Sequence, residues 1–270
     1  MVKLIAEIGI NHNGDLSLCK EMIKSAKDCG ADYVKFQKRN PDICVPEDQK
    51  SVLRQTPWGE MTYLDYKHRI EFNDEYFEID QYCKDIGIEW FVSIWDEDSL
   101  NFMAENFSNS ITKIPSAKAT DISLMSKAAD KFEKVIVSTG MCTLPQIHDI
   151  YKTINRQQLI LFHTVSTYPS EFKDLSMDTI DYLKQTYYLP VGYSGHESGV
   201  LVSTASVYKG VSWIERHFTL DKSLWGTDQS SSLDPNEFKE LCQNVKFLST
   251  TLGQRTDILE CEIPVMKKLR

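Results

Sequence analysis

The stretch Val191-Gly192-Tyr193-Ser194-Gly195-His196 decides the fold, because a short apolar run ends in a polar side chain just before a helical pattern begins. The same arrangement recurs at Trp213-Ile214-Glu215-Arg216-His217, again ahead of a helical segment. In a parallel α/β barrel, side chains at the C-terminal ends of neighbouring strands converge on one cavity. His196 and His217 are therefore predicted to face each other there. Two neutral imidazoles with few other protein ligands would hold a divalent metal and leave positions open for a substrate.

Apolar runs of strand length alternate with amphipathic segments of helix length along the whole chain. Eight such units, with strands rich in Val and Ile, favour a closed parallel barrel over an open sheet. The 270 residues are close to the roughly 250 that are typical of that fold. We therefore predict an α/β protein with one domain over residues 1–270, a (β/α)8 TIM barrel. The predicted strands are Lys3–Gly9, Asp32–Gln37, Glu89–Ser93, Ser110–Ile114, Lys134–Ser138, Gln158–His163, Pro190–Ser194 and Ser212–His217, and the predicted helices are Leu16–Cys29, Asp74–Ile86, Glu97–Asn106, Ile122–Lys131, Leu144–Ile154, Met177–Thr186, Val200–Tyr208 and Asn236–Leu252.

The composition is that of a globular cytoplasmic protein, with 41% apolar and 26% charged residues. No stretch approaches the roughly 18 apolar residues of a membrane span. The 7 cysteines form no Cys-x-x-Cys pair, which indicates reduced thiols and a cytoplasmic location. A net charge of −9 argues against a nucleic-acid partner, because binding to phosphate backbones requires a basic face. It does not exclude a small anionic substrate, since a few lysines inside a cleft dominate the local field.

The longest insertion, from Lys38 to Asn73, follows the second predicted strand. It is read as a loop with prolines and aromatic residues, among them Trp58 and Tyr63. Loops of this length in a compact barrel are usually functional, and this one lies on the C-terminal rim. It is therefore a candidate for substrate contacts.

Polar side chains gather where the predicted strands end, and two of them are lysines. Lys35 and Lys113, together with several hydroxyls, suit a phosphate or a carboxylate. Backbone N–H groups in Ser138-Thr139-Gly140 and Ser194-Gly195 are predicted to add donors to such an anion. The full set at the strand ends is Glu7, Lys35, Gln37, Ser93, Lys113, Ser116, Ser138, His163, Ser194, His196, Glu215 and His217.

Several of these residues also have a plain structural interpretation. His163 is expected to be a structural hydrogen-bonding residue, and Glu215 either takes a direct role or forms a buried ion pair with the adjacent Arg216. His12 follows the first strand directly, so it either reaches the rim of the site or packs elsewhere. His148 lies in a predicted helix and is expected on the surface, whereas His68 in the long insertion is left unassigned.

Six segments in order resemble the sialic acid synthase family, which condenses phosphoenolpyruvate (PEP) with an acylamino-sugar aldehyde. The resemblance covers essentially the whole chain, and the joint occurrence of the segments is what makes it specific. The segments are Ala6-Glu7-Ile8-Gly9-Ile10-Asn11-His12-Asn13-Gly14, Gly30-Ala31-Asp32-Tyr33-Val34-Lys35-Phe36-Gln37, Lys113-Ile114-Pro115-Ser116, Ser138-Thr139-Gly140-Met141, Tyr193-Ser194-Gly195-His196 and Glu215-Arg216-His217-Phe218-Thr219.

The resemblance implies a cytoplasmic synthase that makes a sialic acid-type nonulosonic acid and phosphate from PEP and an N-acetylmannosamine-like aldehyde. It implies Mn²⁺ or Mg²⁺ between His196 and His217, and an acid–base or electrostatic role for Glu7. The catalytic set is Glu7, Lys35, Lys113, His196, His217 and Asp228. The implied PEP contacts are Lys35, Ser93, Lys113, Ser116, Ser138 and Ser194, and the implied sugar contacts are Gln37, Tyr168 and Asp228.

Two departures from the family pattern stand out. Ser166 occupies the place of the asparagine in the family's Asn-x-Tyr-Pro motif, which shortens a polar group that faces PEP. The sequence stops at Lys267-Lys268-Leu269-Arg270, about where a C-terminal antifreeze-like domain begins in resembling proteins. That domain lends an arginine to the partner subunit's site. We therefore expect a homodimer or a separate antifreeze-like domain as partner, a truncated sequence, or a different aldehyde.

Two alternatives stay open. A related PEP-dependent synthase would make a keto-deoxy sugar acid from an aldose phosphate, which requires a second phosphate site. The rim cations that we identify for such a site are only Lys38, Arg39 and Lys118. The chain is otherwise a non-catalytic barrel subunit that needs a partner domain, although a protein without catalysis has no reason to keep so many buried polar residues.

Overall fold

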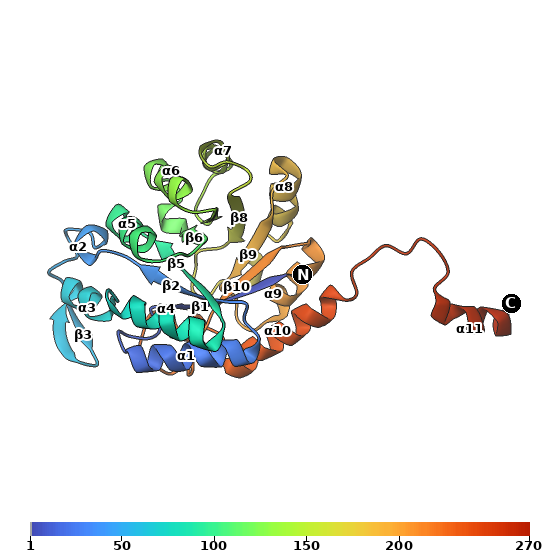
Figure 1. Cartoon of the computed structure of the whole chain (residues 1–270), viewed down its shortest axis with the longest axis horizontal. Helices are drawn as coiled ribbons and strands as arrows, with labels where there is room; N and C mark the ends of the chain where they lie inside the picture. The colour runs from blue at the N-terminus through green and yellow to red at the C-terminus, as the bar shows by residue number, and fades with distance from the viewer. Residues whose placement is uncertain (1) are drawn as a thin grey trace.

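Eight parallel strands close into a barrel with helices around it in the computed structural model, which describes residues 2–270 (Figure 1). Around the barrel the strands follow the order β1-β10-β9-β8-β7-β6-β5-β2. The predicted (β/α)8 barrel is therefore confirmed, and each observed strand bound lies within one residue of its prediction. The strands are β1 (Lys3–Gly9), β2 (Tyr33–Lys38), β5 (Glu89–Ile94), β6 (Ile111–Ile114), β7 (Lys134–Ser138), β8 (Leu159–Thr164), β9 (Val191–Gly195) and β10 (Trp213–His217).

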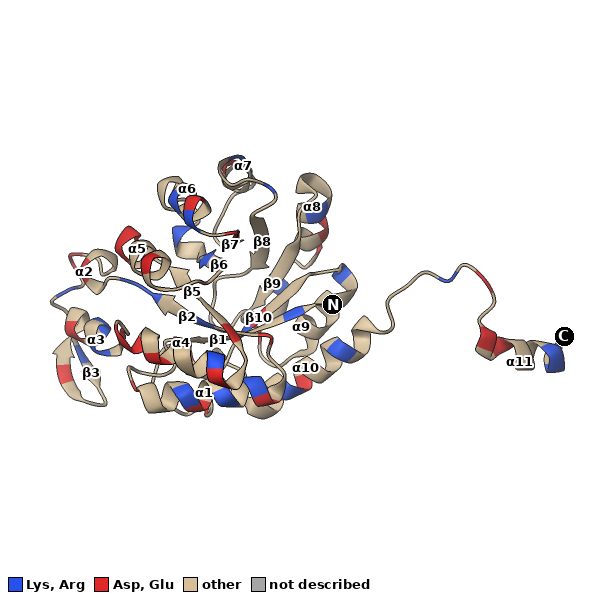
Figure 2. Ribbon diagram, in the orientation of Figure 1, with Lys and Arg blue, Asp and Glu red and all other residues tan. Residues whose placement is uncertain are grey.

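The helices cover the outside of the barrel, and charged residues of both signs are spread over them (Figure 2). Several begin at an aspartate whose carboxylate accepts a backbone N–H of the first turn, as Asp96 and Asp121 do. No helix within residues 2–270 has the length and apolar character needed to cross a membrane. The helices of the barrel are α1 (Leu16–Cys29), α4 (Glu75–Ile86), α5 (Glu97–Asn106), α6 (Ile122–Lys131), α7 (Leu144–Thr153), α8 (Asp178–Tyr187), α9 (Leu201–Ala205) and α10 (Pro235–Ser249), with 3-10 turns at Ser116–Lys118, Phe172–Asp174, Ser206–Lys209 and Gln229–Ser231.

Two predicted helices are shorter than expected. The segment predicted as one helix over Val200–Tyr208 is α9 followed by a 3-10 turn, because Ser206 Oγ donates to the Ser203 carbonyl (2.7 Å) and competes with regular helical bonding. Helix α10 ends at Ser249 rather than Leu252, since the hydroxyls of Thr250 and Thr251 donate back to backbone carbonyls at its end.

The insertion predicted as a loop over Lys38–Asn73 is folded, which corrects the prediction. It contains α2 (Pro41–Cys44), an antiparallel hairpin of β3 (Leu53–Thr56) and β4 (Gly59–Thr62), and α3 (Tyr63–Ile70). Gly59 has φ +102° at the hairpin turn, and Thr62 Oγ1 accepts the Asp65 N–H (3.1 Å) to start α3. The hairpin and α3 lie at one side of the barrel (Figure 1).

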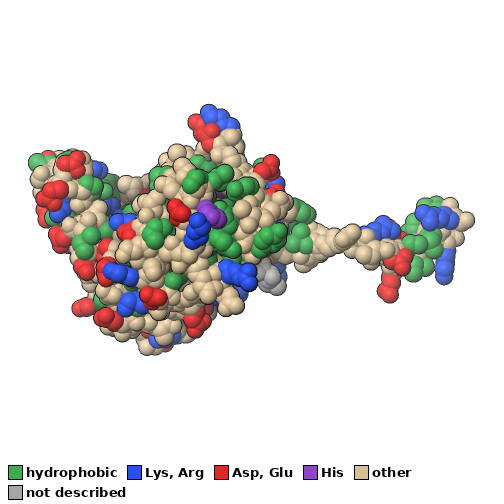
Figure 3. Space-filling model, turned by 90° about the horizontal axis from the view of Figure 1, so that it is seen from above, with side chains coloured by type: hydrophobic (Ala, Val, Ile, Leu, Met, Phe, Trp, Pro, Cys, Tyr) green, Lys and Arg blue, Asp and Glu red, His purple; other side chains and the backbone are tan. Residues whose placement is uncertain are grey.

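Beyond α10 the chain leaves the barrel. An extended segment leads to a 3-10 turn (Glu260–Glu262) and to α11 (Ile263–Leu269). Two views at right angles both show α11 standing clear of the barrel (Figures 1 and 3).

The barrel interior is filled by a small apolar cluster that closes the end of the barrel opposite the polar residues. The buried members are Ile5, Phe91, Ile136, Ile160 and Phe162. Gly192 of β9 lies opposite Phe162 of β8 in the strand register, and a Cβ at Gly192 would overlap the Phe162 ring. The glycine therefore gives the ring its space.

We predict that Gly192→Ala lowers the free energy of unfolding by about 2 kcal/mol or more, because Phe162 is fully buried and has nowhere to move. Urea unfolding followed by circular dichroism measures this change. The double variant Gly192→Ala/Phe162→Leu should recover part of the loss. An unchanged unfolding midpoint in Gly192→Ala would show that the strand relaxes freely.

Candidate active site

A cavity of about 220 Å³ lies at the C-terminal ends of the barrel strands. Every predicted site residue except Asp228 lines it. The cavity thus draws on side chains from all eight strands or from the residues that follow them directly. The predicted residues that it brings together are Glu7, Lys35, Gln37, Ser93, Lys113, Ser116, Ser138, Ser166, Tyr168, Ser194, His196 and His217.

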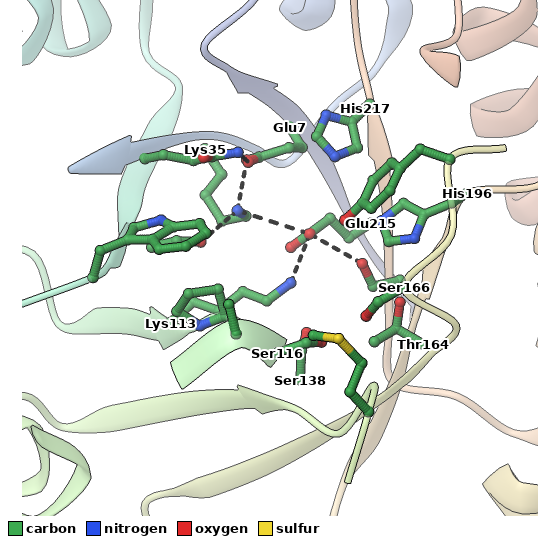
Figure 4. Close-up of a pocket in the computed structure, with 18 residues that line it drawn as sticks. Glu7, Lys35, Lys113, Ser116, Ser138, Thr164, Ser166, His196, Glu215 and His217 are labelled. Atoms are coloured by element: carbon green, nitrogen blue, oxygen red, sulfur yellow. Dashed lines mark hydrogen bonds and ion pairs between the residues drawn. The ribbon is translucent and has the colours of Figure 1, made fainter. Parts of the chain in front are cut away.

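The two buried lysines are each held by a buried glutamate (Figure 4). Lys35 Nζ lies 2.6 Å from Glu7 Oε2 and donates to Ser93 Oγ at 2.7 Å. Lys113 Nζ lies 2.6 Å from Glu215 Oε1, which is also 3.8 Å from Lys35 Nζ. The floor of the cavity therefore holds two positive and two negative charges in contact.

Glu215 belongs to this network, and its strand neighbour Arg216 does not. Burial alone would raise the pKa of Glu215, but the charges of Lys113 and Lys35 outweigh burial and lower the pKa to about 2. Arg216 points to the other face of β10, where its Nη1 lies 3.1 Å from Glu197 Oε1. The suggested ion pair between Glu215 and Arg216 is therefore wrong, because successive strand residues face opposite sides.

Hydroxyl groups line another wall of the cavity around Gly140. A Cβ at Gly140 would collide with Ser166 Oγ and come within 2.8 Å of Ser116 Oγ, so the absent side chain lets these hydroxyls converge. Ser166 Oγ and Thr164 Oγ1 are buried without a hydrogen-bond partner within the described residues. Buried polar groups normally have a partner, so these two hydroxyls are suited to a bound ligand.

Backbone donors contribute less here than predicted. The Thr139 N–H donates to the Phe162 carbonyl (2.9 Å) within the sheet and is not free for a ligand. Ser194 lies inside β9, and its hydroxyl donates to Glu215 Oε1 (3.2 Å). The predicted anion-binding turns are therefore partly used by the barrel's own hydrogen bonds.

The two strand-end histidines lie side by side, with ring centroids 5.6 Å apart (Figure 4). His196 Nδ1–H donates to the Val165 carbonyl (2.8 Å), which orients the ring and leaves Nε2 without a proton. Burial lowers the pKa of His196 to about 3, so the ring is neutral near pH 7. His217 Nδ1 is buried and has no hydrogen-bond partner among the described residues. Tyr168 covers His196, with ring centroids 4.1 Å apart.

The other histidines lie outside the cavity lining. His12 does not reach the rim: it is buried, stacks on Phe72 at 4.0 Å, and its Nδ1 accepts the Gly14 N–H (3.1 Å). His163 donates Nε2–H to the Leu175 carbonyl (2.7 Å), as its structural interpretation predicts. His148 is exposed on α7 and His68 pairs with Asp42 at 3.3 Å.

Asp228 is the predicted site residue that does not line the cavity. It lies in the segment after β10, half-buried, and its Oδ1 accepts from Thr227 Oγ1 (2.7 Å). Asp228 still lies close enough to the cavity to act on Tyr168, which lines it. The pKa of the Tyr168 phenol is raised first by the burial of Tyr168 and then by the negative charge of Asp228. Asp228 therefore does not line the cavity, and the sugar contact that the resemblance implies for it stays a prediction.

Trp95, Met141 and Thr164 also line the cavity, although none was predicted as a site residue. Thr164 is the last residue of β8, one residue beyond the predicted strand, and Trp95 follows β5, two residues beyond its predicted strand. Met141 has φ +62° and is 70% exposed, and no sequence signal points to it.

Polar residues gathered at the C-terminal end of an eight-stranded parallel barrel are the signature of a TIM-barrel enzyme. The family model described as the NeuB family matches residues 22–257. The chain belongs to the NeuB family, whose members among its relatives are sialic, legionaminic and pseudaminic acid synthases. It is thus an enzyme of the transferase type that forms carbon–carbon bonds.

Two relatives and one solved structure illustrate the similarity. The N-acetylneuraminate-9-phosphate synthase of Homo sapiens is 36% identical over 98% of this chain and 76% of its own length. The N,N'-diacetyllegionaminic acid synthase of Legionella pneumophila is 35% identical over 93% of this chain and 73% of its own length. The sialic acid synthetase of Leptospira borgpetersenii, solved with citrate, has a TM-score of 0.89 at 29% identity, covering 99% of this chain and 90% of that one.

We predict that the buried, neutral His12 makes stability depend on pH. Burial lowers its pKa to about 3 from 6.5, so between these values the unfolded chain binds more protons than the folded chain. The free energy of unfolding should therefore fall as the pH drops from about 6.5 towards 3, by at most about 1.4 kcal/mol per pH unit from this residue.

Urea unfolding at pH 7, 6 and 5 tests this for the wild type and His12→Gln. His196 remains in both proteins, so the difference between the two curves isolates His12. The variant should show a shallower pH dependence. Parallel curves would mean that folding does not change the pKa of His12.

Proposed function

We propose that this protein condenses PEP with an acylamino-sugar aldehyde and releases a nonulosonic acid and inorganic phosphate. One observation carries the proposal: the buried Lys35 and Lys113 line a cavity together with two buried hydroxyls, of Thr164 and Ser166, that have no hydrogen-bond partner within residues 2–270. Cations and hydroxyl donors around a small cavity suit a compact phosphorylated anion. Membership of a family of nonulosonic acid synthases supports PEP as that anion.

The lysines on the cavity floor can bind an anion while each keeps its glutamate partner. Glu7 and Glu215 balance Lys35 and Lys113 when no anion is present. An arriving PEP phosphate would take hydrogen bonds from the lysine ammonium groups and from the hydroxyls of Ser116, Ser138, Thr164 and Ser166. Each ammonium has three N–H donors, so it can contact the phosphate without leaving its glutamate.

Ser166 suits this role even though its side chain is shorter than asparagine. Its hydroxyl points towards the space beside Gly140 and has no partner within the described residues. The approach of the Gly140 backbone brings Ser116 and Ser166 together. A short hydroxyl there fits a crowded wall better than a longer amide.

The donor set of the two histidines fits a divalent metal, Mn²⁺ or Mg²⁺. His196 and His217 would hold it: His196 is neutral with Nε2 unprotonated, and His217 has a buried ring nitrogen without a partner. Within residues 2–270 there is no group of three or more His, Cys, Asp or Glu side chains arranged for a metal. A metal bound by two imidazoles would keep open positions and supply Lewis-acid activation of the aldehyde oxygen.

The chain's own residues account for the rest of the chemistry. C3 of PEP attacks the aldehyde carbon to form the new carbon–carbon bond, and the aldehyde oxygen takes up a proton. Water adds to the cationic C2 and loses a proton. The C2–O bond to phosphate then breaks while the C2 hydroxyl gives its remaining proton to the departing phosphate, which leaves the ketone. Glu7 is the proposed acid–base group at the reacting centre, and its Oε1 is fixed by the Gln37 amide (3.1 Å).

We predict that the wild type, supplied with Mn²⁺, PEP and an acylamino-hexose, releases phosphate in a strictly aldehyde-dependent way. Lys113→Met should lower kcat/KM by at least about 100-fold, because it removes a preorganised cation from the anion site. Phosphate release measured with and without aldehyde checks both expectations.

Two further variants keep this test independent of folding. Lys113→Met leaves Glu215 unpaired and buried, so Lys113→Met/Glu215→Gln serves as the variant with both charges removed. Lys127→Met, at an exposed ion pair, is the control. The proposal fails if folded, metal-supplied wild type gives no aldehyde-dependent phosphate with any acylamino-hexose tried.

Metal dependence gives a separate prediction. Treatment with a chelator should abolish turnover, and Mn²⁺ or Mg²⁺ should restore it in the wild type but not in His217→Asn. His148→Asn, at an exposed histidine, should behave as the wild type. Calorimetric titration of Mn²⁺ into each protein reports binding without turnover. Equal Mn²⁺ affinity in wild type and His217→Asn would remove His217 from the metal site.

A further inference from the structure

Lys67 of α3 is a buried cation that has no role in the proposed PEP site or metal site. Only 8% of the residue is exposed, and its Nζ lies 5.2 Å and 5.1 Å from the ring centroids of Tyr63 and Tyr66. Within residues 2–270, no carboxylate lies within 4.0 Å of this ammonium. Buried lysines are almost always paired, so an unpaired one indicates a missing anion.

Arg39 is a second buried cation at the edge of the active-site cavity. Its guanidinium lies over the Trp95 ring at 4.4 Å and donates Nη2–H to Gln37 Oε1, and both of these neighbours line the cavity. Its Nε has no hydrogen-bond partner in the part of the chain that the structure describes, and Glu71 Oε2 is 3.9 Å away from it. Glu71 is shared, because its other oxygen lies 3.3 Å from Lys38 Nζ. Arg39 therefore keeps donor capacity for a ligand.

Two neutral donors complete what we call the rim cation cluster, defined as Arg39, Tyr66, Lys67 and Trp95. Tyr66 Oη and Trp95 Nε1 are both buried without a hydrogen-bond partner among the described residues. Burial, followed by the charge of Arg39, lowers the pKa of Lys67 to about 8, so the two cations influence one another and Lys67 stays mostly charged at pH 7. The carboxylates of Asp228 and Glu71 act in the opposite direction and raise the pKa of Lys67, but neither lies within 4.0 Å of its ammonium, so within the described residues the cluster keeps donors for an anion.

The cluster is separate from the PEP lysines. Lys35 and Lys113 lie on the barrel floor, each in contact with its own glutamate. The rim cation cluster instead adjoins the cavity at Gln37 and Trp95, from β2 and from the residue after β5. An anion on the second substrate, entering above PEP, would reach it.

We propose that the rim cation cluster binds a phosphate ester at the far end of the aldehyde substrate. This inference rests on the proposed function and names its substrate class: a phosphorylated acylamino-hexose, converted into a nonulosonic acid phosphate. The three carbons of PEP add to C1 of the hexose, so a 6-phosphate on the sugar becomes a 9-phosphate on the product. Relatives of this chain include synthases named for a phosphorylated product and for an unphosphorylated one. Overall similarity therefore does not decide between a phosphorylated and an unphosphorylated sugar. The rim cation cluster favours the phosphorylated one.

The sequence alone favours an unphosphorylated sugar, because the rim cations that it identifies for a second phosphate site are only Lys38, Arg39 and Lys118. Lys38 is occupied by Glu71 and by the Phe72 carbonyl (2.8 Å). A loop over Lys38–Asn73, as the sequence predicts, gives Lys67 no defined orientation, and the helix that orients it is visible only in the structure. Helix α3 turns Lys67 inwards and supplies the missing cation.

Steady-state phosphate release from PEP, compared between N-acetylmannosamine and its 6-phosphate, tests this substrate class. The wild type should prefer the 6-phosphate by at least about 10-fold in kcat/KM. Lys67→Met should raise KM for the 6-phosphate by about 10- to 100-fold, the effect expected for losing a hydrogen bond to a charged group. It should leave KM for PEP and for the unphosphorylated sugar unchanged, whereas Lys67→Arg should retain the preference.

Controls separate the failure of this inference from failure of the reaction itself. Lys118→Met changes a rim lysine outside the cluster and should keep the wild-type preference. Lys67→Met removes an unpaired buried charge, so the Tm of this variant should not be lower than that of the wild type. If neither sugar supports turnover, the proposed function fails, and calorimetric titration of the 6-phosphate still tests the cluster. Equal Kd in wild type and Lys67→Met, or equal use of both sugars by the wild type, would overturn the inference.

Discussion

The contact between two buried lysines and two buried glutamates at one end of the barrel is the constraint on which the site depends. Four charges in a protein interior are tolerated only when each has a partner at close range. The parallel register supplies those partners: Glu7 of β1 lies opposite Lys35 of β2 and His217 of β10, and Glu215 lies opposite Ser194 of β9. Closure of the barrel then brings Lys113 of β6 across to Glu215. The network exists only in the closed barrel.

The proposed anion binding depends on local donors and not on the net charge of −9, because Lys35 and Lys113 keep free N–H groups although Glu7 and Glu215 balance their charges. Charges on the outer helices are screened by solvent and ions, whereas those in the cavity act at a few ångströms in a medium of low polarity. The hydroxyl wall around Gly140 adds donors without adding charge. Anion recognition is thus a property of the cavity and is independent of the overall balance of the surface.

Much of the fold and most of the cavity could be predicted from the sequence, because strand ends are marked by periodic apolar runs and a barrel makes all of them converge. β1 and β7 were predicted to the residue, and Lys35 and Gln37, both predicted at a strand end, line the cavity. Asp228 lies outside the cavity lining, in a segment after β10 whose course follows no periodicity, so the sequence alone cannot place it. The hairpin of the insertion was missed because its exposed strands lack the apolar alternation that a buried strand shows.

The folded insertion between β2 and α4 divides the work of recognition between two parts of the chain. The residues proposed for PEP are fixed by strand register and cannot move without disturbing the barrel. Lys67, the residue proposed to select the second substrate, lies on helix α3 outside the barrel. This helix is held by an apolar cluster of Ile10, Tyr66 and Ile70. Changes in the insertion between β2 and α4 can therefore alter the sugar that is accepted, while the proposed PEP site at the strand ends stays the same.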